Sequence, residues 1–204
     1  MKNKIIAVIG AGGKTTLIHR LAEEYRRKGA SVLVSTTTHM LVEPDTDLSC
    51  DSFAVMEKIK KTGYCMAGAV CPENSAKMQS LPEQMLHDLM KQVDYALIEA
   101  DGAKHYALKY PSEQEPVIPE GTTDVILVLG SWDLGKTCKD VVFRFEHMTS
   151  ALGISGDMKA DKQMLQWIWQ AYEEKLKNMD YHGHFHVILS EKTDQGLMFH
   201  TLEE

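Results

Sequence analysis

The sequence has neither a long hydrophobic run nor a cluster of basic residues. Its N-terminal apolar run extends only from Ile5 to Ile9 before it meets a group of glycines. Such a run is too short for the apolar core of a signal peptide or for a membrane span. We therefore expect a cytoplasmic protein that does not interact with a membrane.

Positive charge is also scarce, because 22 lysines and arginines face 29 aspartates and glutamates, for a formal net charge of -7. Proteins that bind nucleic acid need a basic patch to meet the phosphate backbone. We find no such run, and nucleic acid is excluded as an expected partner. Any anionic ligand must be met by a few local cations.

Paired cysteines are the third absence. The four cysteines are scattered without a CxxC spacing, which argues against a disulfide framework or a structural zinc site. We expect reduced, partly buried thiols at Cys50, Cys65, Cys71 and Cys138.

The composition that remains is that of one globular domain over residues 1–204, with 44% hydrophobic and 25% charged residues. Apolar β-rich runs alternate with segments of helical periodicity, which predicts an α/β fold with a doubly wound, mainly parallel sheet. The predicted strands are residues 4–9, 30–35, 94–100, 124–129 and 185–189. The predicted helices are residues 15–27, 55–61, 82–93, 144–152 and 161–179.

The most informative segment is GAGGKTT, which lies between the first predicted strand and the first predicted helix. Glycines let backbone N–H groups turn toward an anion, and a helix N-terminus favours negative charge there. The segment departs from the standard GxxxxGK[ST] pattern, because Val8 stands where the first glycine belongs. We expect a nucleotide-binding loop of Gly10, Ala11, Gly12, Gly13, Lys14, Thr15 and Thr16, with Lys14 on the outer phosphates and the Thr15 hydroxyl on Mg²⁺.

An acidic cluster, EADGAK, follows the third predicted strand. It is similar to the acidic strand end that orients Mg²⁺ in P-loop NTPases and to a DxxG switch with Glu99 replacing the aspartate. Either Glu99 or Asp101 could hold the metal-bound water, and the Gly102 amide could contact a γ-phosphate. The residues leave the assignment between the two acids open.

Threonines and a histidine follow the second predicted strand. Thr36, Thr37 and Thr38 could bind phosphate or metal waters, and His39 could act as a base. Capping and turn formation by the same hydroxyls is an equally good reading.

The segment SEKTD follows the last predicted strand, where guanine-reading GTPases carry NKxD. Lys192 and Asp194 are in register with that motif, whereas Glu191 replaces the asparagine. Contact of Lys192 and Asp194 with a nucleotide base is one reading, and an ordinary solvated loop is the other. Because no long final helix covers this edge, a second copy of the chain is a candidate to do so, which would make a homo-oligomer.

A few cations follow predicted strand ends in this otherwise acidic chain. Lys104, Lys109, Lys136 and Arg144 would form an anion-binding rim that neutralises charge on a transferred phosphoryl group or holds an anionic second substrate. Isolated surface lysines are the simpler alternative.

Taken together, GAGGKTT, TTTHM, EADGAK continuing through KYPSEQEPVIP, and LGK resemble the YqeC family, accessory proteins of selenium-dependent molybdenum hydroxylases. The resemblance extends from about Ile5 to Arg144. The family usually has a VHRPE-like stretch where this chain has VFRFE, so that only Arg144 and Glu146 carry over.

The resemblance implies a fold of the P-loop NTPase type and a role in maturing a selenium-containing cofactor of a molybdenum hydroxylase. The expected cofactor is Mg²⁺ with ATP or GTP, and the expected partners are the nucleotide, an anionic cofactor precursor and the hydroxylase. In the leading hypothesis an NTPase uses Lys14 and Glu99, with Asp101 or His39 positioning water. GAGGKTT is also similar to the GTNGKTT loop of Mur ligases, so a small-molecule kinase or ligase is one alternative, and a non-catalytic nucleotide-gated binding module is another.

Overall fold

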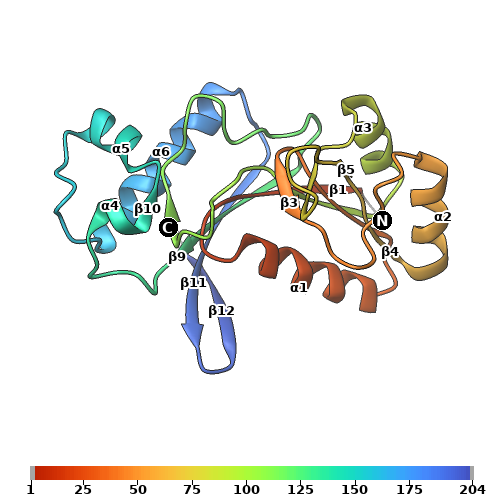
Figure 1. The fold of residues 1–204 in the computed structure, drawn as a ribbon, viewed down its shortest axis with the longest axis horizontal. Helices are drawn as coiled ribbons and strands as arrows, with labels where there is room; N and C mark the ends of the chain where they lie inside the picture. Colours follow the sequence, from red (N-terminus) through yellow and green to blue (C-terminus); the bar gives the residue numbers. More distant parts are fainter. Residues whose placement is uncertain (1–2, 203–204) are drawn as a thin grey trace. The chain divides into compact units, whose positions relative to one another are not determined.

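The computed structural model describes residues 3–202, which divide into two compact units (Figure 1). The first unit contains residues 3–8, 15–102 and 117–124. The second contains residues 9–14, 103–116 and 125–202. The glycine-rich turn therefore belongs to the second unit, and the helix that follows it continues in the first.

The first unit is built on four parallel strands. They lie in the order β1 (Lys4–Gly10), β7 (Tyr95–Glu99), β2 (Val32–Thr36) and β4 (Tyr64–Met66), and the last two residues of β1 belong to the second unit. Val8 and Thr36 pair with Glu99 from its two sides. The carboxyl ends of β7 and β2 thus lie side by side at Glu99, next to Val8 of β1.

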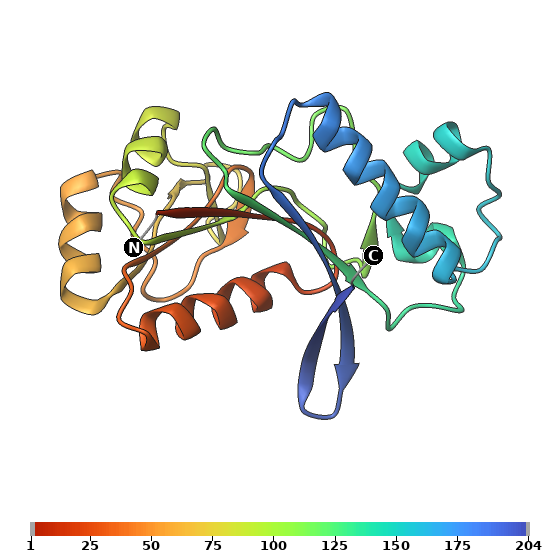
Figure 2. The ribbon, with the colours of Figure 1, turned by 180° about the vertical axis from the view of Figure 1, so that it is seen from behind.

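Helices cover both faces of these strands, as Figures 1 and 2 show from opposite sides. On one face lies α1 (Lys14–Arg27), where Tyr25 stacks on Tyr95 of β7 with 3.7 Å between ring centroids. On the other face, α2 (Ser52–Thr62) and α3 (Glu83–Lys91) bury Val55, Ile59, Leu86, Leu89 and Met90 against the strands. Along each strand, successive side chains point alternately to the two faces of the sheet. Both faces of this parallel sheet are therefore apolar and buried.

A small antiparallel sheet completes the first unit. Its strands lie in the order β3 (His39–Leu41), β6 (Lys77–Gln79) and β5 (Ala69–Val70). None of these short strands was predicted, because each is too brief to show a periodic pattern of its own.

The second unit contains β9 (Asp124–Gly130), whose first residue belongs to the first unit, then β11 (His184–Thr193) and β12 (Gly196–Leu202). The short strands β8 (Leu108–Lys109) and β10 (Val142–Phe143) pair in parallel. Its helices are α4 (Cys138–Val141), α5 (Phe145–Leu152) and α6 (Lys162–Asn178). Asp161 caps α6 by accepting a hydrogen bond from the Met164 amide at 3.0 Å.

The predicted α/β class and the mainly parallel sheet are confirmed. The last strand differs from the expectation, since β11 continues past Leu189 to Thr193 and turns into β12. An antiparallel partner explains the extension, because a hairpin strand can carry polar residues on its exposed positions. Thr193 pairs with Gly196, whose φ of +105° suits glycine in the turn.

The described cysteines are free thiols, as expected, and Cys65, Cys71 and Cys138 are buried, whereas Cys50 is exposed and not partly buried as expected. Burial raises the pKa of the Cys65 thiol to about 11, so this residue stays protonated and unreactive at neutral pH. Within residues 3–202, none of the helices combines the length and the apolar character that a membrane span needs.

A stability prediction follows from Asp94, which precedes β7. Its carboxylate accepts hydrogen bonds from the Ser31 amide and the Ser31 hydroxyl, both at 2.8 Å, and these bonds lower the pKa of Asp94 below its ordinary value of 3.8. We expect Asp94→Ala to reduce the free energy of unfolding at pH 7 by about 1–3 kcal/mol. Urea unfolding measures this loss.

Because the folded pKa lies below the unfolded one, this stabilisation is complete above pH 3.8 and is lost as the pH falls through the folded pKa. The gap between the parent protein and the variant should therefore shrink in strong acid. Asp88→Ala, at an exposed site on α3, is the control and should change stability by no more than about 0.5 kcal/mol. Equal losses for the two variants would contradict the assignment.

Candidate functional site

The glycine-rich turn of the second unit follows β1 and has the backbone conformation that its sequence predicts. Gly10, Gly12 and Gly13 have φ values of +87°, +88° and +105°, in the region that side chains with a Cβ rarely adopt. The Ala11 amide donates to the Val128 carbonyl of β9 at 2.9 Å. The turn is therefore anchored to a buried strand.

Gly12 is the most constrained position of this turn. A Cβ placed on it would lie 2.5 Å from the Gly130 nitrogen and 2.8 Å from the Ala107 carbonyl oxygen. The Gly130 amide itself donates to the Ala107 carbonyl at 2.9 Å. These are backbone atoms in a hydrogen-bonded arrangement, so no side chain can be accommodated there without moving the chain.

Lys14 is buried beneath this turn. Only 5% of its surface is exposed, and its Nζ donates to the Gly10 carbonyl at 2.8 Å. The hydroxyl of Ser190, a fully buried residue of β11, donates to the Gly12 carbonyl. Two donors thus hold the carbonyls of the turn, and the Lys14 ammonium remains within the loop itself.

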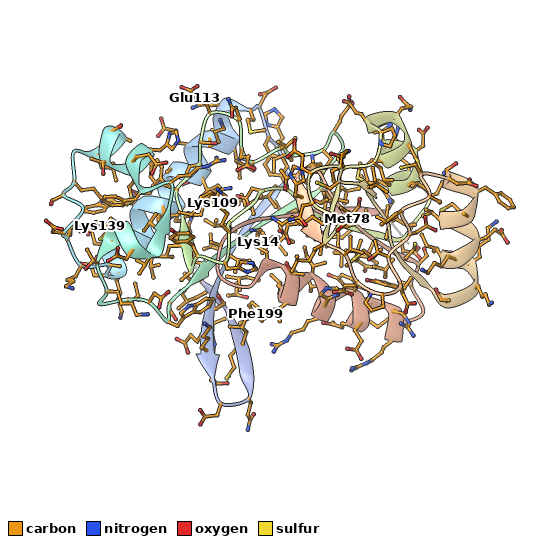
Figure 3. All side chains as sticks on the ribbon, viewed as in Figure 1. Lys14, Met78, Lys109, Glu113, Lys139 and Phe199 are labelled. Atoms are coloured by element: carbon orange, nitrogen blue, oxygen red, sulfur yellow. The ribbon has the colours of Figure 1, made fainter. Side chains whose placement is uncertain are left out.

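Two apolar side chains of β12 lie against Gly13. Leu197 Cδ1 would be 2.5 Å from a Cβ on Gly13, and Phe199 Cε1 would be 3.7 Å away. Phe199 and Lys14 are labelled in Figure 3. The hairpin of β11 and β12 therefore screens this side of the turn from water, which strengthens the electrostatic interactions of the Lys14 ammonium.

In the first unit, the acidic cluster lies at the end of β7. The Thr15 hydroxyl, at the start of α1, donates to Glu99 Oε2 at 2.8 Å. Glu99 is 7% exposed and Asp101 is fully buried, whereas Gly102 is half-buried. The structure thus brings together Thr15 and Glu99, the two residues expected to bind Mg²⁺, and both present the oxygen atoms that this ion prefers.

The threonines after β2 bond mainly to the backbone. The Thr36 hydroxyl donates to the Glu99 carbonyl at 2.8 Å, and the Thr37 hydroxyl donates to the Val117 carbonyl at 2.7 Å. The Thr38 amide donates to the Thr36 hydroxyl at 3.0 Å. These bonds favour the capping role for Thr36 and Thr37, while His39 is exposed on β3 and Thr16 is exposed on α1.

Three expected rim residues of the second unit gather around one aromatic ring. Lys104, Lys109 and Arg144 lie 5.3, 5.9 and 5.4 Å from the centroid of Phe143. Glu115 Oε2 accepts from both Lys109 Nζ and Arg144 Nη2 at 2.8 Å. We call these five residues the cation cluster. The fourth rim residue, Lys136, is exposed and pairs with Asp133 instead.

The expected base-reading residues lie on the hairpin. Lys192 is on β11, with its Nζ 4.6 Å from the Trp132 ring centroid, and Asp194 is in the exposed turn before β12. The NKxD comparison assumed that the last strand stops after Leu189 and that both residues follow its end. The structure differs, because β11 continues to Thr193 and contains Lys192.

Sequence reasoning missed Glu115, Phe143, Ser190 and the two apolar residues of β12. Glu115 belongs to a segment rich in Pro, Glu and Lys, where one acid among several gives no sign that it bridges two cations. Ser190 begins the polar segment SEKTD, and its place directly after an apolar run was the one available signal. Leu197 and Phe199 carry no signal, because they reach the turn only through hairpin pairing.

With this geometry established, comparison with known proteins identifies the chain. The family model described as "YqeC protein" matches residues 6–146. The chain belongs to the YqeC family. The relative "Uncharacterized protein YqeC" of Escherichia coli (strain K12) is 34% identical over 161 residues, which cover 75% of this chain and 62% of that protein.

This YqeC family member therefore spans less than two thirds of the length of the curated relative that it matches. No solved structure matches the chain significantly. The resemblance inferred from GAGGKTT, TTTHM and EADGAK is confirmed at the level of the family, whose matched region contains the turn, the acidic cluster and the whole cation cluster.

We expect Gly12→Ala to destabilise the protein far more than Gly135→Ala. Both glycines have nearly equal φ values of +88° and +87°, but a Cβ at Gly135 meets nothing within 4 Å. The control should lose about 1 kcal/mol from backbone strain alone. Gly12→Ala should lose a further 1–3 kcal/mol or so from overlap with rigid backbone. Denaturant unfolding measures the stability loss of each variant. Equal losses would show that the turn can accommodate a Cβ at Gly12.

Proposed function

We propose that this YqeC protein binds Mg²⁺ with ATP or GTP and hydrolyses the nucleotide. The observation that carries the proposal is the turn Gly10–Lys14. Its glycines adopt positive φ, Gly12 is pressed against backbone, and a buried lysine begins the helix that follows. Such a turn before a helix is a phosphate-binding arrangement, because amides and helix dipole both favour an anion.

Lys14 is the residue that would meet the outer phosphates. In the absence of nucleotide its ammonium bonds to the Gly10 carbonyl, a neutral acceptor. A polyphosphate would offer a charged acceptor, and charge-assisted hydrogen bonds are roughly twice as strong as neutral ones. Replacing the Gly10 carbonyl by a phosphate oxygen as the acceptor of Lys14 Nζ would therefore favour nucleotide binding, and the backbone conformation of the turn would not have to change.

The metal would be held by Thr15, which follows Lys14 directly in the chain, and by Glu99. Their 2.8 Å hydrogen bond already places a hydroxyl and a carboxylate together. Mg²⁺ supplies charge neutralisation to the phosphates when bound. Among residues 3–202 no group of three or more His, Cys, Asp or Glu side chains could hold a metal by itself, which suits an ion that retains water and phosphate ligands.

The water that attacks the γ-phosphate would be positioned by Asp101. This carboxyl is fully buried two residues after Glu99, whereas His39 is exposed on a separate strand. A buried acid holds its orientation better than an exposed imidazole does, and orientation is the main protein contribution to phosphoryl transfer. Gly102 would contribute its amide in the way the DxxG comparison suggests.

The biological role proposed from the family resemblance is maturation of a selenium-containing cofactor for a molybdenum hydroxylase. The molybdopterin and selenium donors of such a cofactor carry phosphate groups, and the cation cluster is suited to groups of that kind. A second candidate function is phosphoryl transfer to an acceptor. The same cluster favours it, because simple hydrolysis requires no second anion site.

We expect Lys14→Ala to weaken nucleotide binding by about 2–5 kcal/mol, since it removes the only charge that the turn offers to the phosphates. Isothermal calorimetry with ATP and GTP in Mg²⁺ measures the loss. Lys28→Ala, which removes an exposed lysine paired with Glu24, is the control and should retain the parent affinity. If Lys14→Ala binds as tightly as Lys28→Ala does, the loop is not the phosphate site.

We expect Glu99→Gln to impair metal-dependent binding more than Asp101→Asn. Loss of a carboxylate next to Mg²⁺ should weaken nucleotide binding about tenfold in Mg²⁺, and should leave it unchanged in EDTA. Asp101→Asn should instead lower the hydrolysis rate while retaining the affinity. The reverse pattern would exchange the roles of the two acids.

Product analysis separates the candidate functions. Release of free phosphate without any acceptor supports hydrolysis, and nucleotide consumption only with an added acceptor supports transfer. Bound triphosphate that stays intact through a single-turnover assay would support the third reading, a nucleotide-gated binding module.

A further inference from the structure

We propose that Trp132 is the platform on which the base of the bound nucleotide stacks. The inference deepens the proposed function and depends on it for the presence of a nucleotide. The position of the indole ring rests on contacts within the second unit alone.

Trp132 lies in a loop directly after the carboxyl end of β9, which ends at Gly130. In open α/β sheets, ligands bind beyond the carboxyl ends of the strands. The Leu134 amide donates to the Ser131 carbonyl at 3.1 Å, which makes residues 131–134 a tight turn with Trp132 at its second position. The side chain of Trp132 is half-buried. A large aromatic ring is thus partly open to solvent at the edge of the sheet where a ligand is expected.

Gly130 contacts both the indole ring and the glycine-rich turn. A Cβ on Gly130 would lie 2.9 Å from Cη2 and from Cζ3 of Trp132. A Cβ on Gly12 would lie 2.5 Å from the Gly130 nitrogen. The benzene ring of the indole is therefore separated from the turn proposed to hold the phosphates by a single residue that has no side chain. A base attached to those phosphates would lie within reach of the ring.

Ser190 of β11 holds the two turns together. The Ser131 amide and the Ser131 hydroxyl donate to the Ser190 carbonyl at 2.9 and 3.1 Å. The Ser190 hydroxyl in turn donates to the Gly12 carbonyl. One buried residue thus fixes the backbone beside Trp132 relative to the glycine-rich turn. A platform held in place before the ligand arrives costs less conformational entropy on binding than one that must be ordered.

One face of the indole ring is covered only by a flexible cation. Lys192 is exposed on β11, and its Nζ lies 4.6 Å from the ring centroid of Trp132. A lysine over an exposed aromatic ring is held weakly, whereas stacking of a nucleic-acid base on an aromatic side chain is a stronger interaction. A base can therefore displace the ammonium from the ring without disturbing any apolar packing.

The same interaction defines what the platform recognises. Stacking contacts the π-face of a base and not its hydrogen-bonding edge. Trp132 would therefore accept adenine and guanine alike and would add affinity without selecting one of them. Lys192 would have a role different from the base contact that the NKxD comparison suggests, because its ammonium covers the ring face that the base would occupy.

Calorimetry in Mg²⁺ with ATP, GTP and inorganic tripolyphosphate, which lacks a base, tests the proposal. Trp132→Leu keeps an apolar side chain but removes the aromatic ring. We expect it to weaken the binding of ATP and of GTP about tenfold each, and to leave the affinity for tripolyphosphate unchanged. Trp132→Phe is the matched control and should bind all of these probes within about threefold of the parent affinity, because it retains a ring that can stack.

Tryptophan fluorescence gives a second readout, because a stacked base quenches the emission of the indole that it covers. ATP and GTP should lower the emission of the parent protein, and tripolyphosphate should not. Trp132→Phe should still bind both nucleotides but lose this change, since the remaining tryptophans, Trp167 and Trp169, lie on α6. If Trp132→Leu does not fold, this comparison decides the question.

The inference is overturned if Trp132→Leu leaves the affinity for ATP and GTP unchanged, if it weakens tripolyphosphate equally, or if only one of the two nucleotides is affected. Equal weakening of all probes would show that Trp132 only supports the fold of the turn. In each of these cases nucleotide binding by the parent protein would leave the proposed function standing. A parent protein that binds neither the nucleotides nor tripolyphosphate would refute the proposed function, and the platform with it.

Discussion

The approach of Gly12 to the backbone at Gly130 and Ala107 is the constraint on which the second unit depends. It fixes the turn after β1 against β9 and against the segment that leads to β8. Because the contact is between main-chain atoms, it leaves no freedom for a side chain and little for a shift of the turn. This contact fixes the position of Gly12, two residues before Lys14.

Charge is used sparingly around that constraint. The chain carries a net charge of -7, yet a buried lysine lies in the turn and another buried lysine lies in the neighbouring cation cluster. Each has a local acceptor, the Gly10 carbonyl for Lys14 and the Glu115 carboxylate for Lys109. The Gly10 carbonyl is a neutral acceptor, so under the proposed function a phosphate would replace it with a stronger, charge-assisted hydrogen bond to Lys14.

The sequence predicted the parts of this arrangement that depend on local chemistry. The glycine turn, the strand and helix on its two sides, and the acid at the end of β7 follow from residue type and periodicity. Glu115 and Leu197 could not be predicted, because their roles come from contacts between segments far apart in the chain. Lys192 and Asp194 illustrate the same limit, since an apolar run ending at Leu189 looks like a strand end until its antiparallel partner is known.

The threonines after β2 show where residue type alone is ambiguous. A hydroxyl suits a phosphate, a metal-bound water and a backbone carbonyl equally well. Thr36 donates to the Glu99 carbonyl, a pairing that only the register of β2 and β7 makes visible, and Thr37 donates to the Val117 carbonyl, which is far away in the sequence. Family membership agrees with the motifs without deciding between these roles.

The most direct test is an experimental structure of the protein with Mg²⁺ and a non-hydrolysable triphosphate. The account predicts phosphates against the amides of Gly12, Gly13 and Lys14, with Lys14 Nζ moved from the Gly10 carbonyl to a phosphate oxygen. A nucleotide bound elsewhere, with the bond from Lys14 to Gly10 unchanged, would contradict it.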